Sequence, residues 1–178
     1  MKISENIFLQ ELQNNNYGEL YELMYRIYPP EYNAFWKDDC SWYINNQYSK
    51  NNFQKELLEE NQRYFFVIHN DKKVGILRLL FDENPEKISD KKCLKLHRIY
   101  LDNKIQGKGI GTAVLKQVDE IAKENNCAFV WLEAMEKKPL AIQFYQRNGY
   151  QQFDEYFYEF DLLRKDYQKM MAFHKKLI

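Results

Sequence analysis

Residues 106–112 read Gln-Gly-Lys-Gly-Ile-Gly-Thr. The chain has only 6 glycines in 178 residues, and three of them, Gly107, Gly109 and Gly111, fall in this stretch. Glycine adopts positive φ angles without steric cost and allows other groups to approach the backbone closely. Successive N–H groups of such a turn can point into one concavity that suits an anion. The sequence therefore predicts that the functional site lies here.

The segments on either side of these glycines favour a phosphate site. Residues 94–101 have the content of a strand, and from Ile110 to about Lys123 the apolar residues recur at helical spacing. The predicted buried positions of this helix are Ile110, Val114, Val118 and Ile121, opposite Lys116, Asp119, Glu120 and Lys123. A helix that begins at the glycines would aim its free N–H groups and the positive end of its dipole at the same concavity.

Two general phosphate-binding motifs fit this segment poorly. A Walker A loop needs Gly-Lys-Ser/Thr at its end, whereas Gly111 is followed by Thr112 and Ala113. The dinucleotide fingerprint G-x-G-x-x-G begins well, but Val114 stands at its third glycine position. Glu133 lies near the place of a ribose-binding acid, so dinucleotide binding stays open as a weak alternative.

Residues 94–150, taken together, resemble the GNAT superfamily of N-acetyltransferases. Residues 106–111 are similar to its Q/R-x-x-G-x-G/A acyl-CoA signature, and 96–101 (Leu-His-Arg-Ile-Tyr-Leu) resemble its fourth strand. Residues 141–150 (Ala-Ile-Gln-Phe-Tyr-Gln-Arg-Asn-Gly-Tyr) resemble its A-x-x-F-Y-x-x-x-G-F/Y helix and turn. The resemblance covers about a third of the chain. It implies an α/β (α+β) fold, the GNAT acyl-CoA N-acyltransferase fold, with a mixed, mostly antiparallel sheet flanked by helices, as a single domain over residues 1–178.

The resemblance also implies a role for each matching residue. The residues expected to cradle the CoA pyrophosphate are Gln106, Gly107, Lys108, Gly109, Ile110, Gly111 and Thr112. In the family the fourth and fifth strands splay apart around pantetheine. Ile99, Tyr100 and Leu101 would offer backbone groups there to pantetheine and to the acetyl carbonyl. Tyr145 matches the tyrosine that commonly protonates the departing thiolate. No metal is implied.

Two positions depart from the family's pattern. Lys138 stands where many members carry an Asn that touches CoA, and a lysine could still reach a carbonyl or a phosphate. His97 occupies a fourth-strand position where relatives often have a Glu that serves as base or proton relay. Because histidine exchanges protons near neutral pH, we expect His97 to be catalytic, beside the alternative of a hydrogen-bonded, partly buried histidine.

The function implied is acetyl transfer from acetyl-CoA to a primary amine by direct attack in a ternary complex. The local pattern is nearest to the small-molecule branch, so a polyamine-like acceptor is the first expectation, with a homodimer as a further one. The family builds its acceptor pocket where this chain has Tyr28, Tyr32, Phe35, Trp36, Trp42 and Tyr43, with Asp38 and Asp39. Aromatic rings and carboxylates would suit a cationic amine, but packing explains the aromatic residues equally well. Two alternatives are an acyl-CoA-binding module without turnover and acetylation of a protein or peptide amine.

Hydrophobic periodicity and turn residues predict the other elements. Helices are expected at 17–28, about 51–60 and 139–147, and strands at 63–69, 74–81, 128–134 and 150–162. Residues 82–92 are expected to form a loop, and residues 167–177 suit either a strand or a helix. Pro29-Pro30 is expected to stop the first helix, and the second should bury Phe53, Leu57 and Leu58.

Composition excludes several classes of protein. The 26 Lys and Arg balance the 26 Asp and Glu, which disfavours a dedicated nucleic-acid binder. No apolar run approaches the roughly 20 residues of a membrane span, and residues 1–6 do not resemble a secretory signal. The three cysteines match neither a disulfide framework nor a zinc spacing. We therefore expect a cytoplasmic protein.

Overall fold

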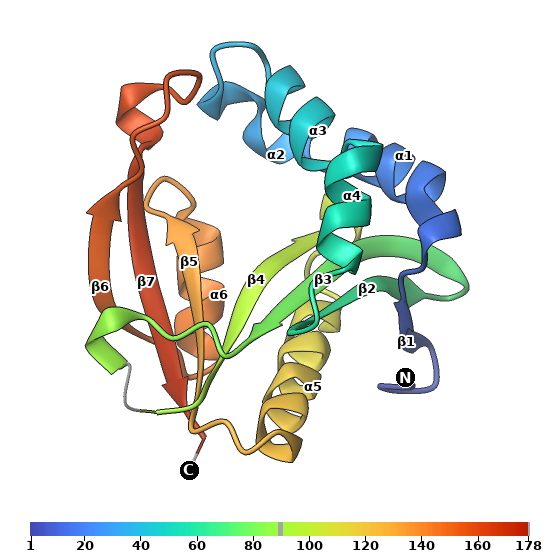
Figure 1. The fold of residues 1–178 in the computed structure, drawn as a ribbon, viewed down its shortest axis with the longest axis vertical. Helices are drawn as coiled ribbons and strands as arrows, with labels where there is room; N and C mark the ends of the chain where they lie inside the picture. The colour runs from blue at the N-terminus through green and yellow to red at the C-terminus, as the bar shows by residue number, and fades with distance from the viewer. Residues whose placement is uncertain (89–90, 178) are drawn as a thin grey trace. The chain divides into compact units, whose positions relative to one another are not determined.

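The computed structural model of the chain describes residues 1–88 and 91–177 (Figure 1). They form two compact units, one of residues 1–78 with 98–111 and one of residues 79–97 with 112 onward. The seven strands are hydrogen-bonded in the order β1-β2-β3-β4-β5-β7-β6. One neighbouring pair, β4 with β5, is parallel, whereas β1 with β2, β5 with β7 and β6 with β7 are antiparallel. This mixed sheet confirms the predicted fold class.

The first unit joins two complete strands to a group of four helices, coloured blue to cyan in Figure 1. Its elements are β1 (Ile7–Glu11), α1 (Tyr17–Ile27), α2 (Pro29–Tyr32), α3 (Ser41–Gln47), α4 (Lys50–Leu57) and β2 (Gln62–His69), with parts of β3 (Lys72–Phe81) and β4 (Cys93–Leu101). Helix α1 buries Leu20, Leu23, Met24 and Ile27, as its spacing predicts.

Three features of this unit differ from the prediction. Strand β1 and helix α3 were not expected, because both are short and neither has a clear apolar period. Helix α1 ends at Ile27, before Pro29-Pro30, as predicted. However, α2 begins at Pro29, since proline is well suited to the first turn of a new helix. In α4 the buried face is formed by Phe53 and Glu56, whereas Leu58 is 81% exposed.

The second unit contains three strands side by side, packed against helices. Its elements are α5 (Ile110–Glu124, which begins in the first unit), β5 (Phe129–Met135), α6 (Pro139–Arg147), β6 (Gln151–Phe157) and β7 (Lys169–Lys176). Strand β7 pairs with β5 on one side and β6 on the other (Figure 1). Asp119 of α5 is bonded to Lys175 of β7, so this carboxylate is buried and not on the solvent face that the helical period predicts.

The end of the chain resolves one alternative and corrects one boundary. Residues 169–176 form a strand, not a helix. The preceding strand ends at Phe157, five residues before the predicted end. The chain then turns at residues 160–163, where the Leu163 N–H donates to the Phe160 carbonyl, and continues into a short 3₁₀ helix at Lys165–Tyr167. The predicted loop at 82–92 contains a 3₁₀ turn, Glu86–Ile88, and its residues 89–90 lie outside the described residues. Of the helices in the described residues, none combines the length and the apolar character that a bilayer crossing requires.

Gly75 of β3 lies close to the backbone of β4. A Cβ at this position would lie 2.3 Å from the Tyr100 carbonyl oxygen and 3.1 Å from the Cα of Leu101. Both contacts are main-chain atoms, which cannot rotate away. The absence of a side chain at Gly75 therefore sets the position of the β4 backbone at Tyr100 and Leu101.

We expect Gly75→Ala to destabilise the protein by about 1–3 kcal/mol, because the added methyl forces β3 and β4 apart. The midpoint of urea unfolding measures this change. Gly18→Ala in α1 is the matched control, because no atom lies within 4 Å of its Cβ position and alanine favours a helix. A Gly75→Ala protein as stable as the wild type would contradict the expectation.

His174 of β7 should make stability depend on pH. Its ring lies between those of Phe129 and Phe153, and burial lowers the pKa of the imidazole. The neutral form is favoured in the folded state, so this stabilisation is complete above the ordinary pKa of about 6.5 and declines as pH falls through the lowered value. Between about pH 8 and about pH 5, the free energy of unfolding measured with urea should fall less in His174→Gln than in the wild type. An equal loss of stability in both proteins would show that titratable groups other than His174 cause the pH dependence.

Candidate active site

The glycine stretch forms an open turn at the beginning of α5. Gly107 and Gly109 both have φ of 76°, and no atom lies within 4 Å of a Cβ built at either position. Residues 106–109 are exposed, whereas Ile110 is buried and fixes the first turn of the helix. The first N–H groups of a helix have no intrahelical acceptor. A turn with left-handed glycines, free space and a helix N-terminus fits a pyrophosphate group.

Strands β4 and β5 pair over a short distance. Every residue of both strands lies in the described part of the chain. The parallel register pairs Cys93 with Phe129, Leu94 with Val130 and Lys95 with Trp131. The register stops before Leu96 and His97 of β4 and before Leu132 of β5. The paired part of β4 and β5 is therefore confined to residues 93–95 and 129–131.

Tyr100 of β4 lies in a cluster of stacked tyrosines in the first unit. Tyr28 stacks on Tyr32 at 4.4 Å and on Tyr43 at 4.5 Å between ring centroids, and Tyr100 meets the Tyr28 ring edge-on at 5.3 Å. The Tyr43 and Tyr100 hydroxyls are 3.1 Å apart. Burial raises the pKa of both Tyr28 and Tyr100, so both phenols are neutral.

This stacking assigns part of the aromatic cluster to packing. Both faces of the Tyr28 ring are covered by other tyrosines, and Tyr28 and Trp36 are 2% and 4% exposed. These two rings are packing residues. Trp42 is 39% exposed, and Tyr32 and Tyr43 are half-buried, so these aromatic rings of the cluster can contact a ligand.

The remaining predicted residues lie in the second unit, which contains His97, Thr112, Lys138 and Tyr145. Tyr145 lies on α6, where its ring packs 5.9 Å from that of Tyr150 and 6.5 Å from that of Phe173. Burial raises the pKa of Tyr145 to about 12, so the phenol is a protonated donor at neutral pH. Lys138 precedes Pro139 at the beginning of the same helix.

The carboxylates at the end of β5 already have partners. Glu133 accepts a hydrogen bond from the Tyr156 hydroxyl at 2.7 Å and pairs with Lys95 at 3.2 Å. Glu136 pairs with Lys169 at 3.0 Å. An amine would therefore have to displace a lysine from either carboxylate.

The motifs do not include Gly75, which lies against Tyr100 and Leu101 of β4, or Asp102, which precedes the turn. Asp102 caps the 3₁₀ helix Asn103–Ile105 by accepting the Lys104 N–H at 3.0 Å. An Asp directly after a strand is a typical capping residue, so sequence could have indicated Asp102. The close contact at Gly75 has no local signal, because its neighbours are 25 residues away in the sequence.

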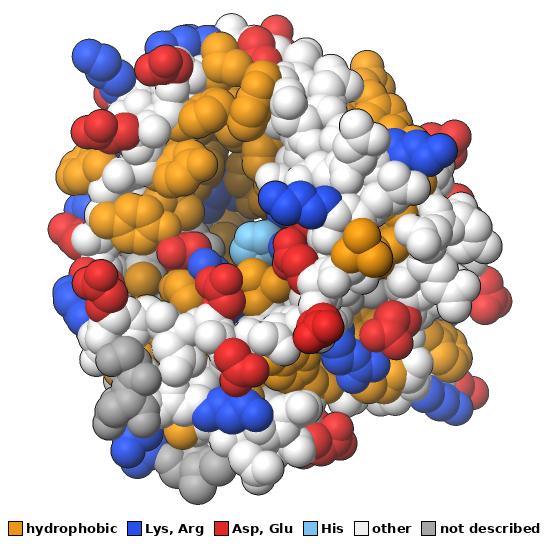
Figure 2. Space-filling view, in the orientation of Figure 1, with side chains coloured by type: hydrophobic (Ala, Val, Ile, Leu, Met, Phe, Trp, Pro, Cys, Tyr) orange, Lys and Arg blue, Asp and Glu red, His pale blue; other side chains and the backbone are white. Residues whose placement is uncertain are grey.

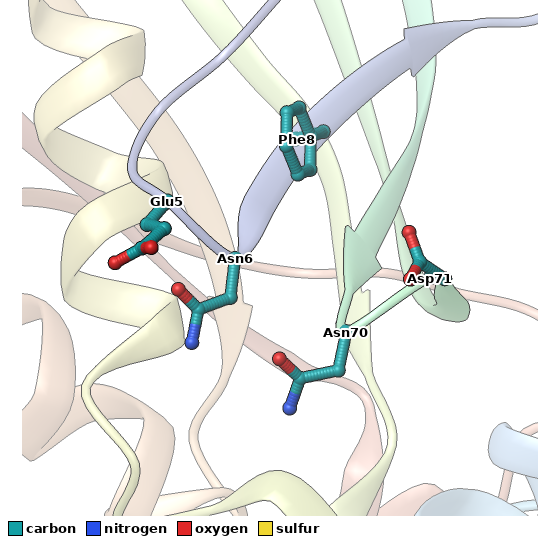
Figure 3. Close-up of a pocket in the computed structure, with 5 residues that line it drawn as sticks. All are labelled: Glu5, Asn6, Phe8, Asn70 and Asp71. Carbon is teal, nitrogen blue, oxygen red and sulfur yellow. The ribbon is translucent and has the colours of Figure 1, made fainter.

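Two surface features are formed by residues outside the predicted set. A pocket of about 450 Å³ is lined by Glu5, Asn6, Phe8, Asn70 and Asp71, from the beginning of β1 and the β2–β3 turn (Figure 3). Its lining includes no predicted site residue. Figure 2 shows acidic and basic side chains interspersed over the drawn face. Hydrophobic side chains gather over the end of β6 and the beginning of β7. There Tyr156, Phe157 and Tyr158 are 38%, 67% and 52% exposed.

Comparison with known proteins places this geometry in one family. A family model described as the acetyltransferase (GNAT) family matches residues 21–150. The chain is 49% identical over 53 residues to the uncharacterized protein YdhI of Bacillus subtilis (strain 168), which covers 30% of this chain and 33% of that protein. It is 37% identical over 57 residues to the spermine/spermidine N(1)-acetyltransferase of the same strain, covering 32% and 38%. The matches span about a third of the length of these curated relatives.

A solved structure shares the fold over nearly the whole chain. The PaiA N-acetyltransferase of Thermoplasma acidophilum, in complex with coenzyme A, superimposes on 96% of this chain and 98% of its own with a TM-score of 0.74 at 17% identity. The family model covers the glycine turn, α5, β5 and α6 together. The chain therefore belongs to the GNAT family of acetyltransferases.

Proposed function

We propose that this protein transfers an acetyl group from acetyl-CoA to the primary amine of a small molecule, by direct attack in a ternary complex. The turn at 106–109 carries the proposal, because its two left-handed glycines leave open space beside the N-terminus of α5. That arrangement suits the pyrophosphate of CoA. The Walker A motif and the dinucleotide fingerprint are both incomplete in this segment.

In the proposed reaction the amine must first lose a proton, because an alkyl ammonium has an ordinary pKa of about 10.4. His97 is the proposed base or proton relay. The neutral nitrogen attacks the acetyl carbon, the carbon–sulfur bond breaks, and the ammonium formed on the product gives up its second proton. Backbone groups of Ile99 to Leu101 are assigned to the carbonyl oxygen, where hydrogen bonds strengthen as negative charge develops.

Tyr145 is proposed to donate a hydrogen bond to the departing sulfur. A thiol has an ordinary pKa of about 8.5, so it is a stronger acid by about three orders of magnitude than a phenol of pKa about 12. Complete proton transfer from Tyr145 to the thiolate is therefore uphill. A hydrogen bond stabilises the developing negative charge, and the proton released by the amine balances the reaction.

The proposed acceptor is a polyamine-like cation. The relative in Bacillus subtilis named for spermine and spermidine supports this choice, as do the accessible rings of Tyr32 and Trp42, which suit a cation. The proposal includes a single functional domain, a cytoplasmic location and a homodimer as the candidate assembly, with no nucleic-acid or membrane partner. Acetylation of a peptide amine and acyl-CoA binding without turnover are the rival functions.

A panel of amines tests the function. We expect the purified protein to release thiol from acetyl-CoA with spermidine or a diamine, and much more slowly with peptides that carry a free lysine or N-terminus. Free thiol measured with a chromogenic disulfide gives the rates. CoA binding without turnover on any amine would favour the binding module. Thermal stabilisation by NAD but not by CoA would overturn the assignment.

Tyr145→Phe should lower kcat by about 100-fold, because it removes the donor to the leaving sulfur without changing the shape of the ring. The dissociation constant of CoA, measured by calorimetry, should stay within about twofold. Tyr25→Phe is the control, because Tyr25 is a tyrosine of α1 that is 65% exposed. Since the pKa of Tyr145 is about 12, the wild-type rate should show no loss from its ionisation up to about pH 10. An unchanged kcat in Tyr145→Phe would remove this role.

A further inference from the structure

Asp102 uses all of its polar groups at the beginning of the glycine turn. Its N–H donates to the Val74 carbonyl at 2.8 Å, and its carbonyl accepts from the Ile105 N–H at 3.0 Å. Its carboxylate accepts from the Lys104 N–H at 3.0 Å and binds the guanidinium of Arg26. The side chain is only 10% exposed, so these bonds replace the water that a carboxylate otherwise needs.

Arg26 extends this contact to α1 and β3. It lies in the last turn of α1, and its second guanidinium nitrogen donates to the Lys73 carbonyl of β3 at 3.3 Å. The guanidinium therefore joins the end of α1, the beginning of β3 and the beginning of the turn. Its fork of donors suits two acceptors held at fixed positions.

Hydrogen bonds continue from Asp102 along the turn to the glycines. The Gln106 N–H donates to the Asn103 carbonyl at 3.1 Å, and the Lys108 N–H donates to the Ile105 carbonyl at 3.4 Å. Both bonds are between residues of this segment itself, which is fixed from outside at three places, one of them the buried side chain of Ile105. Ile110 is buried at one end, and Asp102 is the anchor at the other.

We propose that Arg26 and Asp102 are a pair of positioning residues that hold the turn at 106–109 in the conformation that binds CoA. This inference rests on the proposed function. Charge-assisted bonds to a poorly solvated carboxylate are strong, and they order a turn whose exposed glycines otherwise have wide conformational freedom. The pair acts on the affinity for CoA and acetyl-CoA, and it leaves the chemical step unchanged.

Asp102→Asn and Arg26→Gln test the pair from its two sides. The Asn side chain retains an oxygen for the Lys104 N–H and loses the charge that binds Arg26. We expect each variant to weaken CoA binding in calorimetry about tenfold, to raise the KM for acetyl-CoA similarly, and to keep kcat within about twofold. Amide hydrogen exchange of residues 103–109 should become faster. The double variant should be no weaker than either single variant, because both remove one interaction.

Glu19→Gln is the matched control. Glu19 pairs with Lys73, so this exposed ion pair also joins α1 to β3 but does not involve Asp102. We expect its CoA affinity to equal that of the wild type. CoA affinities unchanged in Arg26→Gln and in folded Asp102→Asn would overturn the inference, as would additive losses in the double variant. If Asp102→Asn does not fold, Arg26→Gln decides, because that side chain is 50% exposed. Failure of the wild type to bind CoA would instead overturn the proposed function.

Discussion

The buried carboxylate of Glu56 is the interaction on which the packing of the first unit depends. This residue of α4 accepts two hydrogen bonds from Arg98 of β4, at 2.7 and 3.0 Å, and lies 3.3 Å from Arg78 of β3. Gln47 of α3 also donates to it at 3.1 Å. Breaking a buried pair of this kind typically costs about 3–5 kcal/mol, because a charge is left without a partner in the core. One side chain thus ties two helices to two strands, and Arg98 directly precedes the residues assigned to the acetyl carbonyl.

Glu56 also shows where sequence reasoning about the fold reached its limit. Periodicity correctly predicted α5 and its buried residues Ile110 and Val118, because apolar side chains report their own burial. The same reasoning places charged residues in solvent, and it was wrong for Glu56 and Asp119. Their partners, Arg98 and Lys175, are 42 and 56 residues away in the sequence. A buried charge depends on a partner that no local pattern reveals.

The candidate site likewise has some features that neighbouring residues predict and others that depend on residues distant in the sequence. The turn at 106–109 was predictable because its conformation depends on glycines within five residues and on the helix that follows them. The positioning contacts of Asp102 were not, because they come from α1 and β3. The tyrosine cluster was predicted from composition and place, but the sequence could not distinguish Tyr28, whose two faces are covered, from Trp42, which is exposed.

Binding through the backbone explains why the turn can be recognised while the amine cannot. In the proposed function the pyrophosphate is held by N–H groups, which every residue except proline carries, so most side chains of residues 106–112 are free to vary. The firm requirements are two positive φ angles and an anchored beginning of the turn. Amine selection instead depends on individual side chains such as Tyr32 and Trp42, on short helices with few backbone constraints. Two proteins that share this fold at 17% identity, as this chain and the CoA-bound structure do, can therefore use different acceptors. The acceptor of this chain has to be found by experiment on the chain itself.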